Sequence, residues 1–92
     1  MMEIKKGNFK IFIGDDETNP QAYMTYYFKT KSVIVIDHTF VVSALRGQNI
    51  ANELFLFIVN MAKEGGWKII PLCSYVVSAF EKHPELQYLL AK

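Results

Sequence analysis

The sequence predicts a single domain of the α+β class (mixed α/β) over residues 1–92. The expected order is an antiparallel three-stranded meander, a crossover helix, a fourth strand parallel to the third, and short C-terminal helices. Two patterns indicate this. Before Val41 the chain is β-branched and aromatic with an apolar period near two, and after Ala51 it is apolar with a period near 3.6. Hydrophobic residues make up 51% of the 92 residues, which is enough for one core.

Three strands are expected before position 42. Glu3–Lys6 is either a short strand or a frayed end, and Phe9–Ile13 alternates as a strand does. Gly14–Pro20 is typical of a solvated hairpin loop, because its acidic residues lack the spacing of a calcium loop. Ala22–Lys29 and Val33–Val41 follow as the second and third strands. The third is apolar on both faces, which predicts a central strand covered on each side.

A helix is predicted from about Gln48 to Lys63, with an apolar stripe along one face and a Gly-Gly pair after it. Trp67–Ile70 is the fourth strand. A strand–helix–strand order makes it parallel to the third strand through a right-handed crossover. Ser74–Lys82 is predicted to be a short helix, and the proline that follows it begins a last short helix, Glu85–Leu90.

Charge and cysteine content narrow the function classes. The formal net charge is +1 without a basic cluster, which disfavours nucleic-acid binding. The single cysteine, Cys73, permits no intramolecular disulfide and fits a reducing compartment. The start lacks the apolar run of a signal peptide, and no apolar run is long enough to span a membrane. We therefore expect a soluble cytoplasmic protein that binds neither nucleic acid nor membranes.

The polar stretch Arg46–Ala51 is the first candidate site. A strand that leads through a glycine-containing turn into a helix leaves N–H groups free for an anion, and the helix dipole favours negative charge there. Gly47 permits close backbone approach, Asn49 tolerates a left-handed conformation, and Arg46 adds a fixed charge. The alternative is an ordinary strand-to-helix turn with a surface arginine.

Cys73 and His38 are the second candidate site. Cys73 precedes the helix that begins near Ser74, and a thiol at a helix N-terminus has a lowered pKa; the alternative is a buried apolar cysteine. We predict His38 on the same face of the third strand as Ile36, with Asp37 on the other face. If the third and fourth strands are adjacent, His38 and Cys73 can approach as a nucleophile–base pair. Otherwise His38 is a core histidine.

A metal site is not expected. His38, Cys73 and His83 are three possible ligands, but their spacing matches no compact zinc pattern. His83 fits better as a helix-end residue beside Pro84.

Three segments, in this order and spacing, resemble a known family. They are Leu45–Ala51, Lys68–Val76 and His83–Leu86. Together they resemble the small single-domain, acetyltransferase-like branch of the GNAT superfamily. The resemblance extends continuously from Ile34 to Leu90 and also fits the order of the elements before it.

The resemblance implies that acetyl-CoA lies in a wedge where the third and fourth strands splay apart, with its pyrophosphate on the turn and its pantetheine arm along the end of the third strand. The family pattern, Arg/Gln-x-x-Gly-x-Gly/Ala, falls on Arg46, Asn49 and Ala51, so Asn49 stands where glycine is usual and its side chain crowds the phosphates. Lys82 is the candidate contact to the 3′-phosphate. The implied catalytic residues are Cys73 and His38. The implied CoA-binding residues are Phe40, Val41, Val42, Arg46, Gly47, Gln48, Asn49, Ile50, Ala51, Ser74 and Lys82.

The function implied is that of an acetyl-CoA-dependent N-acetyltransferase acting on an amine of a small molecule or a protein. Either the amine attacks the thioester directly, with His38 as base and Cys73 near the leaving sulfur, or Cys73 takes the acetyl group first. The chain lacks the helical pair that walls the acceptor site in larger members, so an open acceptor side is implied.

Two alternatives remain: a CoA-binding or protein-interaction module with little or no catalysis, and a structural or dimerising domain that binds no CoA. We expect no metal cofactor and a monomer or weak homodimer.

Overall fold

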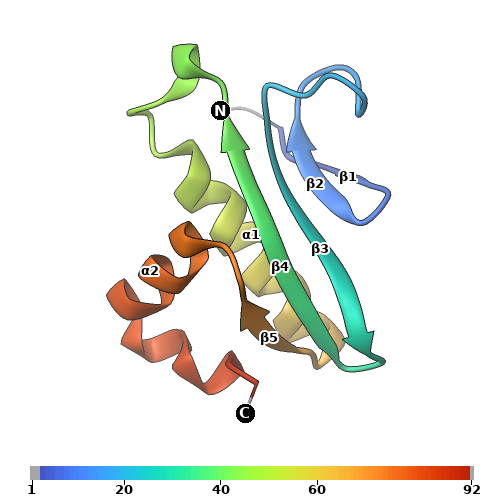
Figure 1. Ribbon diagram of the computed structural model, residues 1–92, viewed down its shortest axis with the longest axis vertical. Coiled ribbons are helices and arrows are strands. Elements are labelled where there is room, and N and C mark those ends of the chain that lie inside the picture. Colours follow the sequence, from blue (N-terminus) through green and yellow to red (C-terminus); the bar gives the residue numbers. More distant parts are fainter. Residues whose placement is uncertain (1–2, 92) are drawn as a thin grey trace.

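The computed structural model describes residues 3–91 and arranges them as a five-stranded sheet in the order β1-β2-β3-β4-β5 (Figure 1). Strands β1 to β4 pair antiparallel, and β5 lies parallel to β4, as predicted. The strands are β1 (Lys5–Gly7), β2 (Lys10–Ile13), β3 (Ala22–Thr30), β4 (Val33–Val41) and β5 (Lys68–Pro71). The α-helices are α1 (Ile50–Gly65) and α2 (Ser74–Lys82), and two short 3-10 helices are η1 (Ser43–Leu45) and η2 (Pro84–Leu89).

The strand boundaries follow local backbone chemistry. Phe9 has a φ of 59° and belongs to the β1–β2 turn, so β2 begins one residue later than the alternation predicts. In the acidic loop, the Asp16 carboxylate accepts hydrogen bonds from the Thr18 amide (3.0 Å) and hydroxyl (2.9 Å), which lower its pKa. This self-contained turn agrees with the predicted solvated hairpin loop.

Helix α1 makes the crossover from β4 to β5. It begins at Ile50, two residues later than predicted, because Asn49 takes a left-handed φ of 65°. It ends where Gly66 adopts a φ of 72°, a conformation that glycine reaches without a Cβ clash. The predicted apolar stripe is buried at Ile50, Leu54, Ile58 and Met61, with Phe55 and Ala62 beside it.

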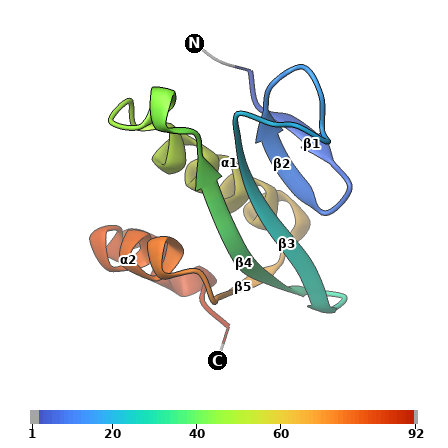
Figure 2. The same ribbon diagram turned by 45° about the horizontal axis from the view of Figure 1, so that its top comes forward.

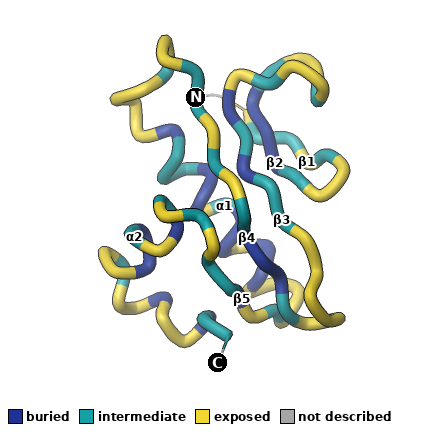
Figure 3. The backbone as a smooth tube through the Cα atoms, in the orientation of Figure 1, coloured by how far each residue is buried: buried dark blue, intermediate teal, exposed yellow. Residues whose placement is uncertain are grey.

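Both α-helices pack against one face of the sheet, and their buried side chains form a single core with it (Figures 1 and 2). The Phe55 ring of α1 meets the Phe80 ring of α2 edge-on, with centroids 5.1 Å apart. No helix among the described residues covers the second face, where Tyr27 is 46% and Phe40 is 39% exposed. The prediction that β4 would be covered on each side is therefore wrong for its C-terminal half, although β4 is an interior strand (Figure 3).

A β-bulge at Asp37 divides β4 into two halves. Thr25 pairs with His38 and Tyr26 pairs with Ile36, so Asp37 is an extra residue without a partner on β3. An extra residue reverses which side chains point to which face. Ile36 faces the helices before the bulge, whereas after it Thr39 pairs with the fully buried Met24 and faces them instead.

The C-terminal segment closes the outer edge of β5. The predicted last short helix is present as the 3-10 helix η2, which begins at Pro84. Leu90 then bridges to Ile69 in parallel, and the Ala91 amide donates to the Ile69 carbonyl at 2.9 Å. None of the helices in residues 3–91 has both the length and the apolar character to span a membrane.

Candidate active site

The turn between β4 and α1 has the backbone of an anion site. Gly47 and Asn49 both have positive φ, 82° and 65°. The Asn49 side chain makes no capping hydrogen bond, so it does not occupy the N–H groups of the first turn of α1. These amides remain available to a ligand at the positive end of the helix dipole.

A pocket of about 310 Å³ opens beside this turn, between the end of β4 and the first and last turns of α2. Arg46 and Lys82 supply positive charge at its wall, as an anionic ligand requires. Its lining residues are Val41, Leu45, Arg46, Gly47, Asn49, Ile50, Ala51, Asn52, Tyr75 and Lys82.

Most of the predicted CoA-binding residues therefore meet at one pocket. Four of them, Phe40, Val42, Gln48 and Ser74, do not line it, and Phe40 lies on the open sheet face with its ring 5.4 Å from that of Tyr23. Gln48 instead donates from its side-chain amide to the Ala44 carbonyl at 3.3 Å.

The prediction missed Leu45, Asn52 and Tyr75, which also line the pocket. Asn52 follows Ala51 in the same helical turn, and Tyr75 follows Ser74 at the start of α2. Their proximity in sequence to predicted site residues could have indicated that they belong to the pocket. Partial burial raises the pKa of Tyr75, which keeps the phenol protonated and able to donate a hydrogen bond to an anion.

Strands β4 and β5 separate just beyond Ile36 and Pro71, the last residues that pair. The Ile36 carbonyl accepts hydrogen bonds from both the Leu72 amide (3.0 Å) and the Cys73 amide (3.2 Å), and from there β5 turns into α2. The remaining part of β4 has no strand on that side among the described residues. This arrangement is a wedge between parallel strands, with its narrow end at Ile36.

The backbone of Val41 faces into the wedge. The Val42 amide donates to the carbonyl of Gln21, the residue just before β3, at 2.9 Å, and backbone groups alternate between the two edges of a strand. The Val41 amide and carbonyl therefore point away from β3. The Arg46 Nε donates to this Val41 carbonyl at 3.1 Å, which folds the guanidinium back toward the wedge.

Cys73 meets Thr39, and not His38, across the narrow end of the wedge. The Cys73 thiol donates a hydrogen bond to the Thr39 hydroxyl, with the sulfur 3.4 Å from Oγ1. Cys73 is also the N-cap residue of α2, and its side chain does not cap that helix. Its side-chain contact is therefore made to β4, 34 residues earlier in the chain.

The predicted face of His38 is wrong because of the bulge, whereas Asp37 lies on the face opposite Ile36, as predicted. His38 pairs with Thr25 and is exposed on the open face, opposite to the helices. The Asp37 carboxylate lies on that same face, where it accepts a hydrogen bond of 2.6 Å from the Thr25 hydroxyl. His38 is thus a solvent-accessible histidine beside the wedge and not a core histidine.

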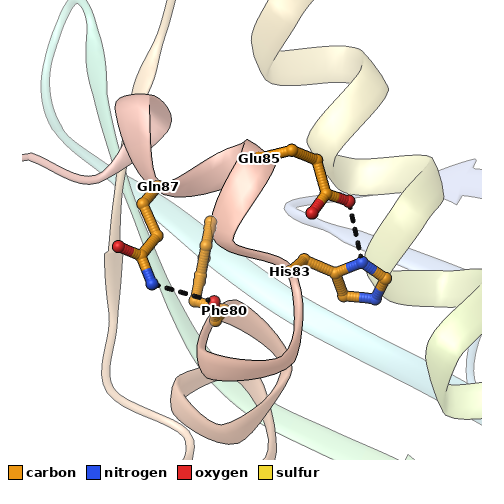
Figure 4. A network of polar contacts seen from close by, with 4 residues as sticks. All are labelled: Phe80, His83, Glu85 and Gln87. Atoms are coloured by element: carbon orange, nitrogen blue, oxygen red, sulfur yellow. Dashed lines mark hydrogen bonds and ion pairs between the residues drawn. The ribbon is translucent and has the colours of Figure 1, made fainter.

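His83 lies at the end of α2 and pairs with Glu85, with 3.1 Å between Nδ1 and Oε2 (Figure 4). Its ring stacks on Phe55 at a centroid distance of 5.8 Å. The pKa of Glu85 is lowered, first by the hydrogen bond from its own amide and then by the one to His83. No group of three metal-ligating side chains occurs among residues 3–91, and His83 acts as a helix-end residue.

Comparison with known proteins gives a family match. Residues 8–89 match the family model of the GCN5-related N-acetyl-transferases. No curated protein matches the chain.

The solved structures that resemble the fold include the following two. A GCN5-like candidate N-acetyltransferase from Staphylococcus aureus is 40% identical, with a TM-score of 0.82 over 98% of this chain and 88% of that one. The ribosomal-protein-alanine N-acetyltransferase of Brucella melitensis biovar Abortus 2308 is 18% identical, with a TM-score of 0.59 over 90% of this chain and 61% of that one. The second likeness concerns the fold alone.

Proposed function

Because the chain belongs to the GCN5-related N-acetyltransferase family, we propose that it transfers the acetyl group of acetyl-CoA to an amine. The observation that carries this proposal is the pocket beside the β4–α1 turn. It joins a helix N-terminus with a free first turn, two cations and the wedge between β4 and β5. These three features suit a pyrophosphate attached to an extended amide chain.

In this proposal the CoA pyrophosphate lies on the amides that follow Asn49, and Arg46 and Lys82 face its phosphates. The pantetheine arm then runs along β4, where the Val41 backbone can pair with its amides. The Nε of Arg46 donates a hydrogen bond to the Val41 carbonyl at 3.1 Å, so this hydrogen bond must break when pantetheine pairs with Val41. The thioester would lie toward the narrow end of the wedge.

We propose direct transfer as the main route. The amine nitrogen attacks the thioester carbonyl carbon, the C–S bond breaks, and its electron pair leaves with the CoA sulfur. His38 takes a proton from the nitrogen, and backbone N–H groups stabilise the oxyanion. The exposure of His38 on the open face supports this assignment, because an acceptor that arrives from solvent meets that face first. Cys73, on the helix side, would lie near the leaving sulfur.

An acetyl-cysteine intermediate is the competing route. It requires the Cys73 thiol to attack the thioester carbonyl carbon, so that the C–S bond to CoA breaks and the thiol proton goes to the departing CoA sulfur. The amine then attacks the acetyl-cysteine, and the Cys73 thiol is restored. Incubation with acetyl-CoA alone, followed by intact-mass measurement, separates the two routes. A mass increase of one acetyl group that disappears in Cys73→Ser would support the two-step route, and an unchanged mass supports direct transfer.

The acceptor is proposed to be an amine on a protein or an exposed small amine. The second sheet face supports this, because neither α-helix covers it and two of its aromatic rings are more than a third exposed. A surface of this kind does not enclose a small substrate.

A thermal-shift titration with acetyl-CoA tests the proposal. A ligand present at about one hundred times its dissociation constant adds about 2.7 kcal/mol to the free energy of unfolding. Arg46→Gln should weaken binding by about tenfold or more, because a charged hydrogen bond to phosphate is lost. Lys31→Gln, an exposed cation in the β3–β4 connection, is the matched control and should bind as the wild type does. The absence of any shift at millimolar acetyl-CoA would reject the proposal.

The second candidate is a CoA-binding module with little or no catalysis. It is favoured by Asn49, whose side chain stands beside the proposed pyrophosphate site where the family pattern has glycine. This candidate predicts the same thermal shift but no release of free CoA with any member of an amine panel. Turnover on one amine, lost in His38→Gln, would exclude it.

A further inference from the structure

A side-chain hydrogen bond between Cys73 and Thr39 joins the two sides of the wedge at its narrow end. Past Ile36 and Pro71 the backbones of β4 and β5 no longer pair, yet the Cys73 thiol and the Thr39 hydroxyl remain within 3.4 Å. Both residues are partly buried. This contact, which we call the floor of the wedge, lies on the helix side, where the proposed function places the thioester.

The bulge at Asp37 puts Thr39 in this place. Without the extra residue, strict alternation from Ile36 would point His38 toward the helices and Thr39 away from them. With it, Thr39 shares the helix-facing side with Met24 and Val41, while His38 points to the open face. The hydroxyl opposite Cys73 is thus a consequence of the β4 irregularity.

The backbone of Cys73 is fixed independently of its side chain. Its amide donates to the Ile36 carbonyl at 3.2 Å, and its carbonyl accepts from the Val77 amide at 3.1 Å. The side chain of Cys73 can still rotate about its Cα–Cβ bond, and the hydrogen bond to the Thr39 hydroxyl fixes the position of the sulfur. A hydroxyl has one proton to donate and two lone pairs, so it can accept from a thiol and can instead donate to a thiolate.

We propose that Thr39 is the positioning residue for Cys73, which holds the sulfur at the floor of the wedge and stabilises it when it carries negative charge. This inference rests on the proposed function, in which Cys73 lies beside the thioester. It applies to both routes. In direct transfer the hydroxyl keeps the thiol close to the departing CoA sulfur, and in the two-step route it aims the attacking sulfur.

Alkylation of Cys73 by iodoacetamide tests the role of Thr39 without any need for an acceptor amine. A hydrogen bond is stronger to an ionised group than to a neutral one, and the thiolate is the form that reacts. Thr39→Val keeps the shape and removes the hydroxyl, so alkylation at pH 7 should slow by about fivefold.

Thr39→Ser supplies the rescue, because it restores the hydroxyl and should alkylate at close to the wild-type rate. Thr30→Val is the matched control, since it removes a hydroxyl from the far end of β3, and it should leave alkylation of Cys73 unchanged. If Thr39→Val does not fold, Thr39→Ala is compared with Thr39→Ser in its place. Equal alkylation rates for the hydroxyl-free variant and the wild type at pH 7, or a slow rate that Thr39→Ser does not restore, would overturn the inference.

Acetyl-CoA binding, measured on the same variants, separates this inference from the proposed function. Thr39 lies outside the pocket at the turn, so Thr39→Val should bind acetyl-CoA within about twofold of the wild type. A wild-type protein that binds no acetyl-CoA would refute the proposed function, whereas the alkylation profile would still report whether Thr39 holds Cys73.

Discussion

Asn49 is the residue on which the affinity of the proposed CoA site depends. Its φ of 65° lies in the left-handed region, which asparagine tolerates better than most residues and glycine tolerates best. Asn49→Gly should therefore leave the free energy of unfolding within about 0.5 kcal/mol of the wild type. It should also tighten acetyl-CoA binding severalfold, because it removes the side chain beside the phosphates. Chemical denaturation and isothermal titration measure the two effects.

The comparison with Asn49→Ala separates backbone strain from crowding. Alanine removes most of the side chain but carries a Cβ in the left-handed region, which costs about 1 kcal/mol. Asn49→Ala should thus lose stability while gaining some affinity. If both variants bind acetyl-CoA more weakly than the wild type, the Asn49 side chain contributes to binding and the crowding argument is wrong.

The junction between α2 and η2 carries a pH-dependent contact. The pKa of Glu85 is lowered in the folded protein by the hydrogen bonds from its own amide and from His83. A carboxylate with a depressed folded pKa adds stability above its unfolded pKa and loses that contribution as the pH falls through the folded value.

Glu85→Gln should therefore be less stable than the wild type at pH 6, and the two melting temperatures should converge as the pH falls through the lowered folded pKa of Glu85. The effect should be small, since Glu85 is exposed. Glu81→Gln, on the exposed last turn of α2, is the control. A gap between wild type and Glu85→Gln that stays unchanged as the pH is lowered until the wild type unfolds would mean that the contact does not depend on the charge of Glu85.

Most elements could be predicted because their patterns hold along their whole length. Helix α1 has one apolar stripe and a glycine stop, and β5 is a short apolar run between that stop and Pro71. The bulge at Asp37 could not be predicted. Residues 33–41 are apolar on both faces, so the pattern is equally compatible with either register, and only pairing with β3 decides between them.

The same ambiguity explains why the candidate site was predicted in part. The turn residues are contiguous in sequence, so their local backbone chemistry was enough to bring them together at one pocket. The contact between Thr39 and Cys73 joins residues 34 apart, and it also depends on the bulge. Alternation along β4 therefore assigned the wrong side chain, His38, to the side that faces Cys73.

The open sheet face bears on the oligomeric state of the whole molecule. We predict a monomer or a weak homodimer. The low net charge and the exposed rings of Tyr27 and Phe40 permit weak association through this face. Sedimentation velocity at about 10 μM should give a monomer, because two scattered rings offer much less than the ~800 Å² per partner of a stable interface. Tyr27→Lys should leave the sedimentation coefficient unchanged at that concentration. A stable dimer that Tyr27→Lys dissociates into monomers would identify this face as a dimer interface. The partner subunit would then cover the proposed acceptor side.

Phe55 couples the core of the whole domain to the proposed ligand site. It is fully buried on α1, and its ring contacts both Phe80 and His83 of the α2 end. Replacing a buried phenylalanine by alanine costs about 3–5 kcal/mol, a large part of the 5–15 kcal/mol that stabilises a typical domain. Phe55→Ala should therefore melt far below the wild type in a thermal scan, whereas Leu56→Ala, whose side chain is 42% exposed, should melt close to it.

Ligand binding should offset much of this loss, because the turn and the pocket are built on the first turn of α1, one helical turn before Phe55. Acetyl-CoA at about one hundred times its dissociation constant for the variant should restore about 2.7 kcal/mol to the free energy of unfolding of Phe55→Ala. The rescue requires that the folded variant keep the pocket, which the melting curve with and without ligand reports directly. A Phe55→Ala variant that folds at low temperature but is not stabilised by acetyl-CoA would mean that packing between α1 and α2 shapes the binding site itself. Core stability and acetyl-CoA affinity would then depend on the same contacts.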